Sequence, residues 1–327
     1  MSGSAFQTNP YDLYKLLEDC HRGILQLPDF QRSWVWDEDR IKSLIASISR
    51  AFPVGALMTL DTGGEVNFKP RPVEGAPAEA KSVAPHSLLL DGQQRMTSLY
   101  QVTLRGKVVE TVTPKNKKVK RWFYIDIRKA LDDAADREEA IAGVPEDRRI
   151  RTDFGREVVL DLSTPEGEYS ALMYPVTQVF DWDRWQDGFD MHWRGDEHEA
   201  VRETFRVFKR HVLENFKYYR VPVISLDRST SKEAVCVVFE KVNTGGKPLD
   251  AFELVTAMYA ADGYELRKDW YGDDEHKGRH KRFVDTMRPA DSEAGIIANV
   301  SNTDFLQAIS LFFTRERRRE AERAGKT

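Results

Sequence analysis

The sequence is poor in cysteine and has no long apolar run. Its two cysteines, Cys20 and Cys236, cannot form a disulfide framework, and it contains no CxxC pair. No stretch approaches the roughly 18 apolar residues that a membrane-spanning helix needs. The first residues, MSGSAFQTNP, lack the basic start and apolar stretch of a secretory signal. These absences predict a protein of the reducing cytoplasm with no membrane partner.

Several catalytic signatures are also missing. Neither GxSxG nor HExxH occurs, and no histidine pair flanks an asparagine in the manner of an HNH nuclease. The final AGKT imitates the end of a phosphate-binding loop, but Glu320 stands where that pattern requires glycine. His276 and His280 have metal-ligand spacing, but Gly278 weakens the helix that would align them. We therefore interpret that segment as a solvated loop.

The charge and composition are those of an ordinary globular chain. Lys and Arg number 49 and Asp and Glu number 53, which gives a net charge of −4. This balance argues against a general nucleic-acid coat but leaves room for a local basic groove. The 11% aromatic content excludes disorder throughout, and the length predicts one large domain or two smaller ones.

The most informative segment is LLLDGQQRMT, residues 88–97. An apolar strand enters a glycine turn and a helix begins at once, so the first helical N–H groups have no partner within the helix. Together with the helix dipole they form an anion site, for which phosphate is the common occupant. Gly92 lets a ligand approach the backbone, and Arg95 adds a cation with bidentate geometry. The alternative is a structural turn in which Arg95 pairs with a core carboxylate.

Two further segments place polar residues between apolar ones. Residues 27–37, LPDFQRSWVWD, suit a pocket that offers the Gln31 amide and the Arg32 guanidinium. The alternative is that the tryptophans are core residues and Arg32 makes a structural salt bridge. Residues 239–249, FEKVNTGGKPL, could close over a ligand with Asn243 pointing inward, although Asn-Thr-Gly-Gly also terminates helices.

Basic residues gather in two places. A predicted hairpin tip could contact DNA phosphates, but a solvated tip explains its charges equally well. A predicted helical face is also basic, and exposure to solvent explains it as well. The tip carries Lys115, Lys117, Lys118, Lys120 and Arg121, and the helical face carries Arg202, Arg206, Lys209 and Arg210.

The periodicity of apolar residues predicts alternating helices and strands. The predicted fold is α/β (α+β), with a small mixed sheet and a largely helical C-terminal part. Asn9-Pro10 is expected to open the first helix, Gly23 to end it, and Asp37 to cap the next. Other helices are expected at 93–104 and at about 196–219, and strands at 24–30, 54–60, 87–90, 108–112, 122–127 and 221–226.

Four segments taken together resemble one family. They are LPDFQRSWVW, FPVGALMTL, LLLDGQQRMTSL and FEKVNTGGKPLDAFEL, in this order within residues 24–254. They resemble the N-terminal domain of GmrSD-type restriction endonucleases, which carries a DGQQR signature and is similar in fold to the ParB and sulfiredoxin superfamily. The resemblance implies a ParB-like nucleotide-binding domain over 1–228, with surface excursions at 61–86 and 128–172. A helical part over 229–327 would pack on it and end before a nuclease domain.

The resemblance implies a role in bacterial defence against phage. Members bind and hydrolyse nucleoside triphosphates and respond to modified DNA, such as DNA with glucosylated hydroxymethylcytosine or a phosphorothioate backbone. We therefore expect an NTPase that uses ATP, GTP or CTP with Mg²⁺, binds modified DNA and gates an HNH-like nuclease domain or partner subunit. A homo-oligomer is a further expectation. One alternative is a non-catalytic recognition module for modified DNA, and the other is a DNA nickase in its own right.

The resemblance and the local chemistry together assign candidate site residues. Asp91 is also the candidate metal ligand, and the absence of cysteine from the DGQQR segment argues against sulfiredoxin chemistry. The catalytic candidates are Asp91, Gln94 and Arg95; the nucleotide-binding candidates are Gly92, Gln93, Thr97, Asn243 and Gly246; the DNA-sensing candidates are Phe30, Gln31, Arg32, Trp34, Lys117 and Lys118.

Overall fold

The predicted fold class is confirmed by the computed structural model. The fold is mixed α/β, with a small mixed sheet and a C-terminal part whose described elements are helices. No described helix is long and apolar enough to cross a membrane. The described residues are 6–31, 33–66, 68–132, 134–152, 155–231, 234–235, 238, 252, 255–256, 259, 264–273, 275–287 and 299–324.

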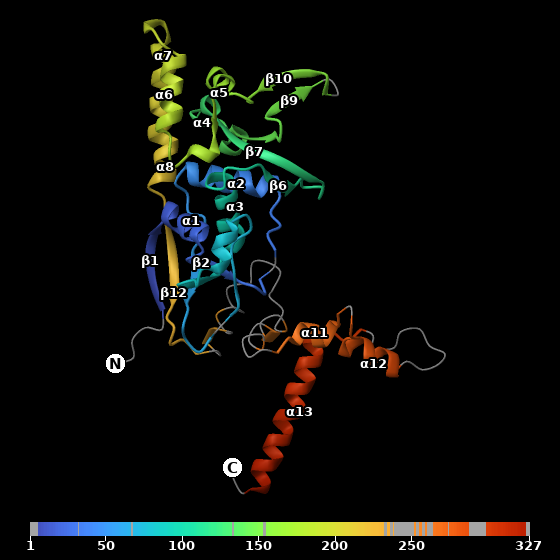
Figure 1. Ribbon diagram of the computed structural model, residues 1–327. Helices are drawn as coiled ribbons and strands as arrows, with labels where there is room; N and C mark the ends of the chain where they lie inside the picture. The colour runs from blue at the N-terminus through green and yellow to red at the C-terminus, as the bar shows by residue number, and fades with distance from the viewer. Residues whose placement is uncertain are drawn as a thin grey trace. The chain divides into compact units, whose positions relative to one another are not determined.

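The chain divides into two compact units, which are described separately (Figure 1). The larger unit contains the DGQQR segment and most of the LPDFQRSWVW segment. It comprises Met1–Leu27, Gln31–Thr62 and Pro70–Arg228, and the smaller unit comprises Pro28–Phe30, Gly63–Lys69 and Ser229–Thr327.

A six-stranded mixed sheet organises the larger unit. Its strand order is β1-β12-β3-β5-β2-β4, so strands from the two ends of the unit are neighbours. The β1–β12 and β3–β5 pairs are antiparallel, whereas β12–β3 and β2–β5 are parallel. The strands are β1 (Phe6–Asp12), β2 (Leu25–Pro28), β3 (Leu57–Asp61), β4 (Pro70–Arg71), β5 (Ser87–Asp91) and β12 (Arg220–Leu226).

The start of the first helix differs from the prediction. Asn9 and Pro10 lie in β1, which pairs with β12 from Phe6 to Asp12, and this tertiary pairing overrides the local helix-start signal. Asp12 is the N-cap instead, because its side chain accepts a hydrogen bond from the Lys15 N–H. The helix α1 (Leu13–Arg22) ends at Gly23, as predicted.

Two further helices pack with α1 to form the core beside the sheet. In α2 (Glu38–Ser49) Asp37 is the N-cap, as predicted, and its side chain accepts from the Arg40 N–H. Both α1 and α2 contact α3 (Gln93–Thr103), which follows β5 after a one-residue turn. Ten of the eleven residues of α3 are buried, so this helix lies inside the unit. The short helix η1 (Ala78–Ser82) lies beside α1.

A second sheet is built around a long hairpin. The predicted hairpin is confirmed as β6 (Val109–Val112) and β7 (Lys118–Asp126). Strand β7 also pairs with β8 (Ile141–Pro145) and with β11 (Met173–Pro175), which lie on opposite edges of it because Tyr124 and Ile125 pair with both. The remaining elements of this region are β9 (Arg149–Thr152), β10 (Glu157–Asp161), α4 (Ile127–Ala130), η2 (Arg137–Ala140), α5 (Pro165–Ala171) and η4 (Val176–Gln178).

The predicted long helix over 196–219 is present, with an interruption. It consists of η5 (Asp196–His198), α7 (Glu199–Phe208), the π-helical turn η6 (Lys209–Leu213) and α8 (Glu214–Lys217). An aromatic cluster packs it against α6 (Asp183–His192). The buried rings are Tyr174, Trp185, Phe189, Phe205 and Phe208.

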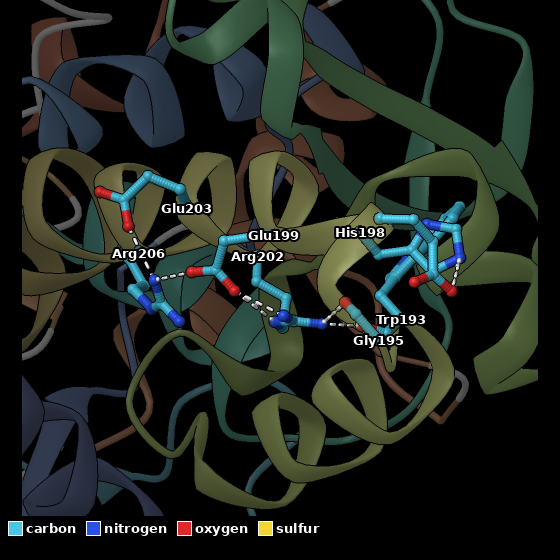
Figure 2. A network of polar contacts seen from close by, with 8 residues as sticks. Trp193, Gly195, His198, Glu199, Arg202, Glu203 and Arg206 are labelled. Carbon is cyan, nitrogen blue, oxygen red and sulfur yellow. Dashed lines mark hydrogen bonds and ion pairs between the residues drawn. The ribbon is translucent and has the colours of Figure 1, made fainter.

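The basic face of α7 is neutralised within the helix itself. Figure 2 shows Arg202 and Arg206 on either side of Glu199, with Glu203 as a second partner of Arg206. Arg202 also donates to the backbone carbonyls of Trp193 and Gly195. Ion pairs and backbone hydrogen bonds therefore account for these two arginines. The pairs of the exposed Arg206 contribute little to stability, whereas the Arg202 side chain is largely covered.

The smaller unit contains three described helices of six residues or more. They are α11 (Leu266–Tyr271), α12 (Arg279–Met287) and α13 (Asn302–Arg323). Ser301 and Asp304 form a capping box at the start of α13. Trp270 packs on Phe305 with ring centroids 4.6 Å apart, which joins α11 to α13.

A buried carboxylate stabilises the region around β7. Glu168 on α5 accepts hydrogen bonds from the Tyr124 hydroxyl and the Trp185 ring N–H, both at 3.0 Å. The Arg148 guanidinium lies 3.8 Å from the same carboxylate. Burial disfavours the charged form and raises the pKa of Glu168.

Substitutions of Glu168 should separate its hydrogen bonds from its charge. Glu168→Ala leaves two buried donors unpaired and should lower the free energy of unfolding by about 2–4 kcal/mol. A raised pKa means that the stabilisation belongs to the protonated form, so it is lost as pH rises through the folded-state pKa. As pH rises, the free energy of unfolding of the wild type should therefore fall relative to that of Glu168→Gln. Urea unfolding at several pH values measures this difference. An unchanged difference would contradict this prediction.

Candidate functional site

The candidate site is built around the turn between β5 and α3. Gly92 has φ +91°, a left-handed conformation that favours glycine, and it forms the N-cap of α3. A Cβ at this position would lie 2.2 Å from Cδ2 of Leu57 on the neighbouring strand. The β3–β5 register shifts here, so that Asp91 is opposite Met58 whereas Leu89 is opposite Thr59. Such irregularities redirect side chains at strand ends.

Arg95 connects this turn to the segment that enters β3. Its guanidinium donates to the carbonyl oxygens of Val54 at 2.7 Å and Ala56 at 2.9 Å. It also contacts the Asp91 carboxylate at 3.1 Å. Gly55 has φ +88°, and a Cβ there would lie 2.7 Å from the guanidinium. The predicted structural alternative, in which Arg95 pairs with a carboxylate, therefore accounts for one of its three contacts. The other two contacts are to backbone carbonyls.

Gln94 connects the same turn to the tryptophan-rich segment. Its side chain accepts from the Val35 N–H at 3.0 Å and donates to the Ser33 carbonyl at 3.2 Å. One turn later Ser98 accepts a hydrogen bond from the Trp34 ring N–H at 2.8 Å. The consecutive side chains of Gln94 and Arg95 thus hold two separate chain segments, residues 33–35 and residues 54–56.

Gln31 contacts β5 directly. Its amide nitrogen donates to the carbonyls of Leu89 and Leu90, at 2.9 and 2.8 Å. The side chain is buried, and its amide oxygen has no hydrogen-bond partner among the described residues. The hydroxyl of Thr97, a fully buried nucleotide-binding candidate, is also unpaired within that part of the chain. Unpaired buried polar atoms are costly and mark places where a water or ligand fits.

Sequence analysis missed two residues that hold Gln31 and Trp34 in place. Glu74 accepts from the Trp34 backbone N–H at 3.0 Å, and Arg71 binds both Glu74 and the Gln31 carbonyl at 3.0 Å. The only signal was the i,i+3 spacing of opposite charges in a Gly- and Pro-rich stretch. That spacing was too common to single out.

A groove of about 830 Å³ lies between the tryptophan-rich segment and the β6–β7 hairpin. Trp36 is held to the hairpin because the Thr111 hydroxyl donates to its carbonyl at 2.6 Å. Two predicted DNA-sensing residues, Trp34 and Lys118, line this one groove, whereas Lys117 is exposed at the hairpin tip beside it. The lining residues are Trp34, Val35, Trp36, Glu110, Thr111, Val112, Asn116, Lys118, Val119, Lys120 and Glu146.

The other candidates have different environments. Phe30 belongs to the smaller unit and packs on Phe68 with ring centroids 5.0 Å apart. Gln93 is buried in the first turn of α3, and Arg32, Asn243 and Gly246 lie outside the described residues.

The donor set for a metal is limited in the part of the chain that the structure describes. No group of three or more His, Cys, Asp or Glu side chains is placed there to hold an ion. Asp91 is half-buried, and one of its oxygens binds Arg95. A single carboxylate fits Mg²⁺ that is carried mainly by nucleotide phosphates and water. Burial raises the pKa of the Cys20 thiol to about 12, so that cysteine is an inert core residue.

This geometry defines a strand–turn–helix unit whose side chains bind two neighbouring chain segments. Residues 13–260 match the family described as GmrSD restriction endonuclease, N-terminal domain. The chain therefore belongs to that family and is a domain of a restriction system. It is also 26% identical, over 281 residues, to an uncharacterized protein of Methanocaldococcus jannaschii. That match covers 84% of this chain but only 45% of the relative's length.

Alanine substitutions at two glycines should measure the close packing at the turn. Gly92→Ala combines a left-handed conformation with the Leu57 overlap and should lower the free energy of unfolding by about 2–4 kcal/mol. Gly106→Ala is the control, because Gly106 has φ +64° and open space around its Cβ. It should cost only about 1 kcal/mol. Equal losses in urea unfolding would show that the overlap is relieved without cost.

Proposed function

We propose that this chain is the nucleotide-hydrolysing, modified-DNA-sensing domain that gates the nuclease of its restriction system. The observation that supports this most is the pair of connections at the Gly92 turn. Arg95 holds one neighbouring segment there and Gln94 holds the other. A ligand that moves the turn would therefore move residues 33–35, which border the groove proposed for DNA.

The nucleotide would bind at the start of α3. The first N–H groups of the helix and its dipole attract phosphate, and the absence of a Cβ at Gly92 lets the phosphate approach the backbone. The guanidinium of Arg95 keeps the turn in shape and contributes positive charge close to it. Part of its donor capacity is unused among the described residues. Fixed donors and charge of this kind stabilise the charge that develops during phosphoryl transfer.

Mg²⁺ would neutralise the phosphates when it accompanies the nucleotide. Asp91 is the residue that would hold it or orient the attacking water, because its carboxylate is half-buried beside the turn. The ion pair with Arg95 keeps the Asp91 carboxylate at the end of β5.

Modified DNA would bind in the groove beside Trp34 and Trp36. The groove combines apolar walls with Lys118 and Lys120 and with two carboxylates, Glu110 and Glu146, of which Glu146 is paired with Lys120. A duplex phosphate would therefore approach the groove at Lys118. Gln31 is buried and does not line this groove; its unpaired amide oxygen lies where its segment meets β5. Because Gln31 binds the carbonyls of Leu89 and Leu90, a ligand that moves it would also move the strand that leads to the turn.

Phosphate release from ATP, GTP and CTP with Mg²⁺ tests the nucleotide half of the proposal. Asp91→Asn keeps the size of the side chain, and Arg95→Lys keeps a charge but not the bidentate link between the two carbonyls. Each should reduce turnover by about 100-fold or more. Arg40→Ala is the control, since Arg40 is an exposed arginine of α2 that contacts Asp37. Circular dichroism should show that all three variants remain folded.

Phosphate release, binding of modified DNA and nicking of DNA, all measured on the purified chain, together separate the three candidate functions. Hydrolysis that depends on Asp91 and responds to modified DNA supports the sensing hydrolase. Binding of modified DNA without any hydrolysis supports a recognition module instead. Metal-dependent nicking by the purified chain would favour the nickase and overturn the proposal.

DNA binding at increasing salt tests the groove. Lys118→Ala removes one phosphate contact, so it should weaken duplex binding and reduce the slope of log K against log salt by about one unit. Lys129→Ala is the control, because Lys129 is an exposed lysine of α4 outside the groove. An unchanged slope for Lys118→Ala would place the DNA elsewhere.

A further inference from the structure

We propose that the larger unit binds a small phosphorylated aromatic molecule, such as a nucleoside monophosphate, in a cavity of about 390 Å³ where α8 leads into β12 (Figure 1). None of its lining residues lines the groove or belongs to the Gly92 turn. Binding there therefore does not depend on the function proposed above. The lining residues are Ala51, Pro53, Arg210, Glu214, Asn215, Tyr218, Tyr219, Arg220 and Pro222.

Two guanidinium groups from separate elements line this cavity. Arg210 belongs to the π-helical turn η6, and Arg220 is the first residue of β12. Neither makes an ion pair or a side-chain hydrogen bond with any residue in the described part of the chain. Both are exposed, so a ligand reaches them from the solvent without breaking an existing contact. Like charges that share a cavity repel each other, and a bound anion relieves that repulsion.

The wall formed by the helix also carries a carboxylate. Arg210, Glu214 and Tyr218 are spaced four residues apart and all line the cavity. Glu214 forms no ion pair with either arginine, so its oxygens remain available to neutral donors such as the hydroxyl groups of a sugar. Two cations against one carboxylate leave an excess of positive charge for the phosphate.

An exposed aromatic ring lies beside apolar walls in the same cavity. The Tyr218 side chain is 67% exposed, and Pro53 and Pro222 lack a backbone N–H. Such a surface suits a planar base, because bases of every kind stack on aromatic side chains.

The chemistry of the walls therefore indicates a ligand that combines a phosphate with an aromatic group. Guanidinium groups match the geometry of a phosphate, and the volume is in the range of small-molecule sites. A nucleotide of single-stranded DNA is the other source of the same chemistry, and the experiment distinguishes the two.

The cavity shares a wall with the segment that holds Arg95. The Tyr219 hydroxyl donates to the Phe52 carbonyl at 2.6 Å and accepts from the Val54 N–H at 3.1 Å. Pro53 lies between these two residues and lines the cavity, and the Val54 carbonyl accepts from Arg95. A ligand in the cavity thus contacts the segment on which the Gly92 turn depends. Any effect on hydrolysis rests on the function proposed above, whereas binding does not.

Calorimetric titration of the full chain without Mg²⁺ tests the proposal directly. The probes are AMP, GMP and CMP, ribose 5-phosphate as a ligand without a base, and a short single strand of DNA. Arg210→Gln and Arg220→Gln should each weaken monophosphate binding by about tenfold, because each removes a charged hydrogen-bond donor. Arg206→Gln is the matched control, since Arg206 lies one turn before Arg210, is paired with Glu199 and Glu203, and does not line the cavity. It should leave the affinity unchanged.

A substitution of the exposed ring separates the base from the phosphate. Tyr218→Ala should weaken AMP binding by about fivefold or more, because it removes the stacking surface. It should leave the affinity for ribose 5-phosphate unchanged. Tyr218→Phe keeps the ring and should bind AMP as the wild type does.

Three results would overturn the proposal. Unchanged monophosphate affinity in both Arg210→Gln and Arg220→Gln would place the ligand elsewhere, such as at the Gly92 turn. Binding of the single strand but of no monophosphate would assign the two arginines to DNA. No binding of any probe would leave the cavity without a phosphorylated ligand.

A measurement on the wild-type chain avoids any dependence on how the variants fold. Arginine modification by phenylglyoxal, mapped by mass spectrometry, should label Arg210 and Arg220 less when AMP is present. Arg206 should be labelled equally with and without AMP. If AMP left the labelling of all three arginines unchanged, the site would be refuted.

Discussion

The contact between the Arg95 guanidinium and the carbonyls of Val54 and Ala56 is the constraint on which the candidate site depends. It joins the start of α3 to the segment that enters β3, and the Asp91 carboxylate completes the arrangement. A guanidinium can span two carbonyls and a carboxylate because its donors lie in one rigid plane. The glycine at position 55 provides the room that this plane needs.

Two glutamine side chains, Gln94 and Gln31, extend this arrangement to the tryptophan-rich segment. Gln94 binds the backbone on both sides of Trp34, and Gln31 binds the carbonyls of β5. The Gly92 turn and the aromatic groove are thus parts of one hydrogen-bonded framework. The segment after α2 belongs to it as well, because the Tyr219 hydroxyl donates to the Phe52 carbonyl and accepts from the Val54 N–H. A change in the groove or in the segment after α2 would therefore reach Arg95 through few covalent and hydrogen bonds.

Local sequence signals predicted the parts of the fold that local chemistry decides. The Asp37 cap, the Gly23 terminator and the hairpin before residue 127 are confirmed. Strand β1 was not predicted, because its pairing partner lies more than 200 residues away in the sequence. The resemblance to a family placed residues near Gln31 and residues 91–95 among the candidate site residues. It did not predict that residues 54–56 meet the Gly92 turn, and nothing in the pattern shows that Arg95 binds carbonyls or that Glu74 supports Trp34.

The space shared by Arg95 and Gly55 has an evolutionary consequence. A Cβ at position 55 would collide with the guanidinium, but the collision disappears once Arg95 is replaced by a small residue. Only the cost of the left-handed backbone would then remain. The two positions are therefore epistatic: an alanine at 55 is far more harmful while the arginine is present than after it is lost. A lineage that has lost the arginine incurs only the backbone cost on losing the glycine, whereas in the reverse order the guanidinium must also shift away from the Val54 and Ala56 carbonyls.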